Sequence, residues 1–177
     1  GEDRAELGEL ESLESLLKRY QAADPDGFEQ FFRRTQKILY NFLLSRLRSQ
    51  EEAEEVLQES YLKLHHNIAR FDPSQSALGW TFQIARNVMI DRIRKNKIRT
   101  TSKLEDHAAT IDPRQQLEAR KTLEELVKDL PAADQALFEQ KFLQDWDYDE
   151  IAKSANTSPA NARQKVSRLL KRIRGTG

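Results

Sequence analysis

The chain has 177 residues, a third of them charged, and its formal net charge is zero. It contains no cysteine, which excludes disulfides, thiolate nucleophiles and cysteine-bound metals. No apolar run is long enough to cross a bilayer, so we expect a cytoplasmic protein with no membrane insertion. Basic residues are nevertheless concentrated in two stretches, 86–103 and 163–174, and the first contains a single acid, Asp91.

Apolar residues recur at spacings of three and four in the first half of the chain, a pattern that predicts helices. These segments are 10–20, 28–43, 57–68 and 82–93. Asp24-Pro25-Asp26-Gly27 has turn-forming residues and ends the first segment, and Phe71 to Ser76 is a loop by its proline and serine content. The second segment has an apolar stripe wide enough to require burial. In the fourth, we expect an inward-facing row, Phe82, Ala85, Met89 and Ile93.

The apolar pattern lapses between residues 96 and 116, where polar and charged side chains dominate and Asp112-Pro113 disfavours helix. We expect a flexible linker there, which in extended form would span up to about 70 Å. The predicted organisation is therefore a domain at 1–95, a linker at 96–116 and a domain at 117–177. The expected fold is all-α, with two small helical domains, the first of them a four-helix domain.

Helical spacing resumes at Leu117 and continues, interrupted by Pro131, to Phe142. Asp147 followed by Glu150 is typical of a capped helix start, with Ile151, Ala152 and Ala155 expected to face inward. Asn156 tolerates left-handed backbone geometry in a tight turn, and Ser158-Pro159 is typical of a second capped start. The sequence therefore predicts a helix-turn-helix whose second helix runs from Pro159 to Arg174.

This second helix is expected to bury Ala162, Val166, Leu169, Leu170 and Ile173 and to present a polar face. The polar residues are Asn161, Arg163, Gln164, Lys165, Ser167 and Arg168. Arginine and glutamine suit base edges in a major groove, whereas lysine and serine more often hold phosphates. A solvated basic helix without a ligand is the alternative.

Several segments together resemble the extracytoplasmic-function (ECF) sigma factors of bacterial RNA polymerase, members of the sigma-70 superfamily. The matching segments are Glu52 to Glu59, Phe71-Asp72-Pro73, Gly79 to Lys95, Leu130-Pro131 and Tyr148 to Ala152. They follow the family's order and span nearly the whole chain. The resemblance implies an alternative sigma factor that binds core RNA polymerase, recognises minus-35 and minus-10 promoter elements and nucleates DNA melting.

The resemblance also implies roles for individual residues. It assigns polymerase binding to Glu55, Gln58 and Glu59. It assigns minus-10 binding to Arg86, Asn87, Asp91, Arg94 and Lys95, with Asn87 helping to capture an extruded base. It assigns minus-35 binding to the polar face that begins at Asn161. The implied partners are core polymerase, promoter DNA and an anti-sigma factor, and the chain itself is expected to be a monomer.

The sequence departs from the family's pattern in three places, one of them His65-His66 in place of a common small-plus-aromatic pair, and it leaves two alternatives. Asn156 replaces a common glycine, and Asn161-Ala162-Arg163 replaces the more usual threonine, valine and cation. Trp80 either packs in the core, which we favour, or stacks on a base. A conventional helix-turn-helix regulator with an N-terminal sensing or dimerisation domain is the alternative function, although no long apolar seam for a symmetric dimer is evident.

We expect no catalytic activity and no cofactor. The histidines His65, His66 and His107 lack the spacing of a helical metal site, and no glycine-rich phosphate loop or nucleophile elbow is present.

Overall fold

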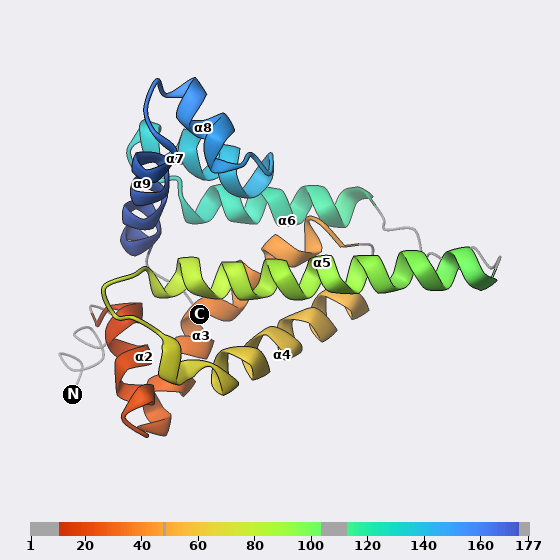
Figure 1. Ribbon diagram of the computed structural model, residues 1–177, viewed down its shortest axis with the longest axis horizontal. Helices are drawn as coiled ribbons and strands as arrows, with labels where there is room; N and C mark the ends of the chain where they lie inside the picture. The colour runs from red at the N-terminus through yellow and green to blue at the C-terminus, as the bar shows by residue number, and fades with distance from the viewer. Residues whose placement is uncertain (1–10, 48, 104–112, 174–177) are drawn as a thin grey trace.

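The computed structural model describes residues 11–47, 49–103 and 113–173, and in these segments it contains helices and loops but no strand. The first half has α2 (Leu13–Gln21), α3 (Pro25–Leu44), α4 (Gln50–His66), a 3-10 turn η1 (Ile68–Arg70) and α5 (Ala77–Lys103) (Figure 1). The second half has α6 (Pro113–Leu126), α7 (Ala132–Phe138), a π-helical turn η2 (Glu139–Leu143), α8 (Tyr148–Ser154) and α9 (Pro159–Arg172). The predicted all-α, two-domain fold is confirmed, while Leu10, His107 and Arg174 lie outside the described residues.

Short polar side chains cap the helices at their N-termini, where backbone N–H groups lack partners within the helix. The Ser12 hydroxyl accepts a hydrogen bond from the Ser15 amide at 3.0 Å, and Ser49 accepts one from Glu52 at 3.1 Å. Asp147 accepts from the Glu150 amide at 2.8 Å, as the sequence predicted for the start of α8. Local sequence therefore fixes where these helices begin.

The core of the first half forms around α3, whose predicted apolar stripe is buried. Phe31, Ile38, Leu39, Phe42 and Leu43 are each at most 2% exposed. Helix α2 packs closely against the start of α3. A Cβ added at Gly27 would lie 2.5 Å from the Leu16 carbonyl oxygen, so only glycine allows this approach.

Helices α4 and α5 complete the first half. The Tyr61 hydroxyl of α4 is 2.7 Å from the Thr35 hydroxyl of α3, and burial raises the pKa of Tyr61. Phe82, Ala85 and Met89 of α5 are buried as predicted. The expectation for Ile93 was wrong, because it is 40% exposed, while Val88 is buried instead. Helix α5 has neighbours on more than one side here, so its buried residues do not follow a single row.

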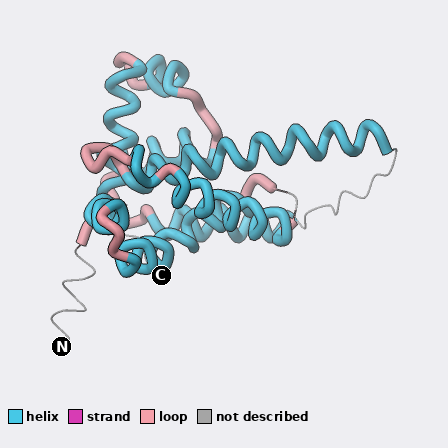
Figure 2. The backbone as a smooth tube through the Cα atoms, turned by 60° about the horizontal axis from the view of Figure 1, so that its bottom comes forward, coloured by secondary structure: helices cyan, strands magenta, loops and turns pink. Residues whose placement is uncertain are grey.

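The expected linker at 96–116 is helical at both ends, because α5 continues to Lys103 and α6 begins at Pro113. Residues 96–103 contain no glycine or proline to stop the helix. Pro113 starts α6, since its fixed φ suits the first turn and its missing N–H is not needed there. The C-terminal part of α5 extends past the other helices (Figure 2).

The second half is built as predicted in its helix-turn-helix. Asn156 adopts a left-handed conformation with φ of 53°, and the Thr157 amide donates to the Ala152 carbonyl at 2.9 Å. Ala162, Val166, Leu169, Leu170 and Ile173 are buried, so the inner face of α9 is confirmed. One expectation was wrong: Ala155 is exposed at the end of α8.

The two halves pack against each other and share one hydrophobic core cluster. The rings of Phe82 in α5 and Phe142 in η2 have centroids 4.6 Å apart. Gly79, in the first turn of α5, lies under α9, since a Cβ there would be 3.2 Å from Leu170 Cδ1. At the same end, the Lys171 ammonium donates to the Ser74 carbonyl at 2.9 Å. The described structure is thus a closed arrangement of the two domains.

Candidate nucleic-acid interface

The polar face of α9 is accessible although the opposite face is buried. Arg163, Gln164, Lys165 and Arg168 are exposed, whereas Asn161 and Ser167 are half-buried. The structure thus brings all six predicted residues to the accessible side of one helix. Such a row of donors and cations has the chemistry that contacts base edges and phosphates in duplex DNA.

Two contacts organise the N-terminal end of this face. The Asn161 side chain donates to the Thr157 hydroxyl at 2.6 Å, which fixes its amide against the turn. The Arg163 guanidinium lies 4.9 Å from the centre of the Tyr148 ring, a cation–π contact. Both residues are therefore oriented before any ligand arrives.

A second polar row lies along α5. Asn87, Asp91, Arg94 and Lys95 are exposed, and Gln83 donates to the Asn87 side-chain oxygen at 3.1 Å. Asp91 pairs with Lys95 at 3.0 Å, and the hydrogen bond from Lys95 lowers the pKa of the Asp91 carboxyl. The spacing of 83, 87, 91 and 95 places these side chains on one side of the helix. Four of the five predicted minus-10 residues therefore share an accessible face.

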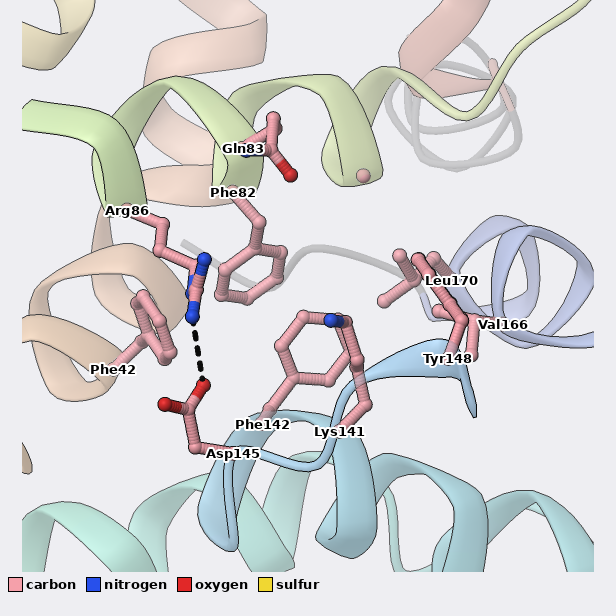
Figure 3. Close-up of a pocket in the computed structure, with 11 residues that line it drawn as sticks. Phe42, Phe82, Gln83, Arg86, Lys141, Phe142, Asp145, Tyr148, Val166 and Leu170 are labelled. Carbon is pink, nitrogen blue, oxygen red and sulfur yellow. Dashed lines mark hydrogen bonds and ion pairs between the residues drawn. The ribbon is translucent and has the colours of Figure 1, made fainter. Parts of the chain in front are cut away.

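Arg86, the fifth predicted residue, points toward the second half of the chain and away from this face. Its guanidinium lies 3.5 Å from Asp145 of the second half, and the residue is half-buried (Figure 3). Position 86 is one residue, or about 100° around the helix, from Asn87. In this arrangement Arg86 belongs to the contact between the domains and not to the row of Asn87.

The contact around Arg86 surrounds a cavity of about 40 Å³ between the halves. Phe42, Phe82 and Phe142 line its apolar part, and Lys141 and Asp145 contribute charges (Figure 3). Burial lowers the pKa of Lys141. The cavity has room for water but not for a cofactor-sized molecule.

The acidic row of α4 lies on a different side of the first domain. Glu55 and Gln58 are exposed, and Glu59 is half-buried. The Arg92 guanidinium of α5 contacts Glu55 and lies 3.6 Å from Glu59. Sequence reasoning did not single out Arg92 or Asp145. Both form charged contacts with residues far away in the sequence, and no local pattern in the sequence signals such pairs.

The remaining candidates from the sequence have structural contacts. Trp80 is half-buried and its ring packs against Phe71 with centroids 5.1 Å apart, so it contributes to the core. His65 contacts the Tyr20 hydroxyl, and its ring centre lies 5.5 Å from that of His66 in a tilted arrangement. Among the described residues, no group of three histidine, aspartate or glutamate side chains is placed to hold a metal ion. Within the same residues, no helix has the length and apolar character that a membrane span requires.

Comparison with protein families accounts for both halves of this architecture. Residues 31–98 match the family model "Sigma-70 region 2" and residues 120–173 match "Sigma-70, region 4". The first range contains α4 and most of α5, and the second contains the helix-turn-helix. The chain is thus a DNA-binding transcription initiation factor built of sigma-70 regions 2 and 4.

Individual relatives indicate which group of sigma-70 proteins the chain resembles. The chain is 25% identical to the ECF RNA polymerase sigma factor SigM of Mycobacterium tuberculosis over 89% of this chain and 81% of the relative. It is 29% identical to SigM of Bacillus subtilis over 77% of this chain and 86% of the relative. A chain in the structure of CnrH in complex with the cytosolic domain of CnrY aligns with a TM-score of 0.48 and 16% identity, covering 88% of this chain and 90% of that chain. The chain belongs to the ECF sigma factors of the sigma-70 family and is an alternative sigma factor.

Proposed function

We propose that this sigma factor binds core RNA polymerase through α4, reads the minus-35 element with α9 and melts the minus-10 element with α5. One observation supports this assignment of separate roles to the helices most directly. Two polar helix faces, one in each sigma-70 region, remain accessible although the two domains pack together. The conventional-regulator alternative does not account for a region 2 match over 31–98.

The α9 face suits duplex DNA. Arg163, Gln164 and Arg168 carry the donors that pair with purine edges in the major groove, and Lys165 supplies a phosphate contact. The N-terminal residues of a recognition helix usually reach the bases, and Asn161 and Arg163 lie in the first turns of α9. We propose that these residues set the minus-35 preference, with Ser167 and Arg168 extending the contact along the groove.

The α5 face suits DNA whose strands have been separated. Opening duplex DNA costs about 1.4 kcal/mol per base-pair step, so a sigma factor must offset this by binding the exposed strand. An amide such as Asn87 pairs with the edge of an unstacked base, and Arg94 and Lys95 provide phosphate contacts. We propose Asn87 as the residue that helps capture a flipped base, with Asp91 beside it.

The α4 face suits a basic protein surface. Glu55, Gln58 and Glu59 form an acidic, glutamine-bearing row, and complementary charge speeds and orients protein docking. We propose this row as the contact with core polymerase.

We propose that the two domains separate when both promoter elements are bound. Elements whose names place them about 25 base pairs apart lie roughly 85 Å apart along duplex DNA, at about 3.4 Å per base pair. In the structure α9 instead lies against the first turn of α5. We propose that the closed form is the free protein and that polymerase binding holds the domains apart. Arg86, released from Asp145, then becomes available to DNA.

The partners beyond polymerase follow from the family and not from a contact in this structure. We propose that the protein is a cytoplasmic monomer when free and that a dedicated anti-sigma factor holds it inactive.

Run-off transcription with core polymerase tests the proposal. The chain is expected to direct a specific transcript only with core enzyme present, and to protect promoter DNA weakly by itself. A footprint of equal strength without polymerase would support the regulator alternative, and failure to bind core polymerase would overturn the proposal.

A further inference from the structure

The acidic row of α4 is held by a cation from the neighbouring helix. Arg92 of α5 places its Nη1 against Glu55 Oε2, and its Nη2 lies 3.6 Å from Glu59 Oε2. Glu55 and Glu59 are one helical turn apart, a spacing at which like charges repel. A guanidinium between them offsets that repulsion and restrains both side chains.

The same helix pair makes a second contact one turn further along. The Asn96 side-chain amide donates to Glu52 Oε1 at 2.9 Å. Two side chains of α5, four residues apart, thus hold three acids of α4. The arrangement is directional, because Arg92 and Asn96 face α4 while Asn87 and Asp91 are exposed on another side of α5.

Arg92 restrains the side chains of Glu55 and Glu59 but leaves hydrogen-bond acceptor positions free on both carboxylates. A carboxylate accepts about four hydrogen bonds, and Arg92 contacts one oxygen of each acid. The side chains of Glu55 and Glu59 remain 48% and 41% exposed, whereas that of Arg92 is 29% exposed. A partner therefore still reaches both carboxylates, and finds them already restrained. Restraint before binding reduces the entropy lost on association.

We infer that Arg92 is a positioning residue for polymerase docking, which presents Glu55 and Glu59 in a fixed orientation to a basic surface of the core enzyme. This inference rests on the docking role proposed for α4. It adds that a residue of the promoter-melting helix α5 supports polymerase binding without touching polymerase. Helix α5 would therefore contribute to both the DNA-binding face and the polymerase-binding face.

Equilibrium binding of the full chain to core polymerase tests this inference. Arg92→Ala is expected to weaken core binding about threefold to tenfold, as for the loss of a partly exposed ion-pair network. Arg92→Lys is expected to restore part of the affinity because it keeps the charge. Arg33→Ala is the matched control, since it removes the same charge from an exposed pair with Glu29 on α3. Thermal unfolding of each variant reports whether it is folded.

A double-mutant comparison separates positioning from a general structural effect. In a chain carrying Glu55→Gln and Glu59→Gln, Arg92→Ala is expected to have no further effect on core binding. An equal loss in both backgrounds would overturn the inference, as would wild-type affinity of Arg92→Ala. If the glutamine variant itself binds core polymerase like the wild type, the proposed docking face is wrong, and the role of Arg92 is wrong with it.

Discussion

Arg86 of α5 and Asp145 of the second domain form a charged contact across the boundary between the two halves, with 3.5 Å between Nη2 and Oδ1. The other carboxylate oxygen of Asp145 lies 3.5 Å from Arg46 Nη1. One acid of the second domain therefore lies between two arginines of the first. Asp145 has a φ of 58°, in the left-handed region that aspartate and asparagine adopt more readily than most residues.

Asp145→Ala is expected to loosen the closed arrangement. Removal of the Asp145 carboxylate leaves Arg46 without its acidic partner, and the Arg46 side chain is only 18% exposed. Arg46 still donates a hydrogen bond to the Phe142 carbonyl. Because Asp145 is 44% exposed, we expect a loss of about 1 kcal/mol or less in unfolding free energy. Small-angle scattering is expected to show a larger radius of gyration. Asp129→Ala, at an exposed carboxyl of the same half, is the control, and equal radii for the two variants would contradict this role for Asp145.

Asn87→Ala and Arg168→Ala are expected to affect different steps of initiation. Asn87 lies in the exposed row of α5 and Arg168 on the exposed face of α9. Loss of one good base contact costs about 1–3 kcal/mol, which corresponds to roughly fivefold to 150-fold. Permanganate reactivity of the melted strand is expected to fall mainly for Asn87→Ala. Promoter retention of the polymerase is expected to fall mainly for Arg168→Ala, and equal losses in both assays would contradict the division of labour.

Glycine is expected to stabilise the chain more at position 23 than at position 156. Ala23 and Asn156 have φ values of 69° and 53°, both in the left-handed region. Alanine pays roughly 1–2 kcal/mol there, whereas asparagine tolerates this conformation. Ala23→Gly is therefore expected to raise the melting temperature by more than Asn156→Gly, in thermal unfolding of both variants. The opposite order would mean that Asn156 is the more strained residue.

Alkaline pH is expected to destabilise the protein partly through Tyr61. Burial raises the folded-state pKa of Tyr61 above its ordinary value of 10.0, so the unfolded chain loses this proton first. The resulting stability is fully present below pH 10 and is lost as the pH rises through the folded pKa. Urea unfolding between about pH 9 and 11 is expected to show a smaller decline for Tyr61→Phe than for the wild type. Burial also raises the pKa values of Tyr40 and Tyr148, so some decline remains in the variant.

Features set by local sequence were predicted well. The caps at Asp147 and Ser158, the left-handed turn at Asn156 and the buried stripe of α3 each depend on residues within one or two helical turns. The exposed row on α9 was also predicted, because α9 has one clearly apolar face.

Features set by contacts between distant segments were not predicted. Helix α5 is covered by α4 and by the second domain, so sequence alone did not show that Arg86 and Arg92 face protein. The closed arrangement depends on Phe142 and Asp145, which lie about sixty residues from their partners Phe82 and Arg86 in the sequence. The polar composition near residue 96 predicted a loop, but nothing there stops the helix before Lys103.

Gly79 makes the separation of the domains adjustable by substitution. A Cβ at this position would lie 3.2 Å from Leu170 Cδ1, which the neighbouring atoms would accommodate only by moving a few tenths of an ångström. Alanine, serine and valine at position 79 would therefore place side chains of increasing volume between α5 and α9 and push the two helices apart by increasing amounts. Such a series varies how readily the molecule opens while every charged side chain proposed to contact promoter or polymerase stays unchanged.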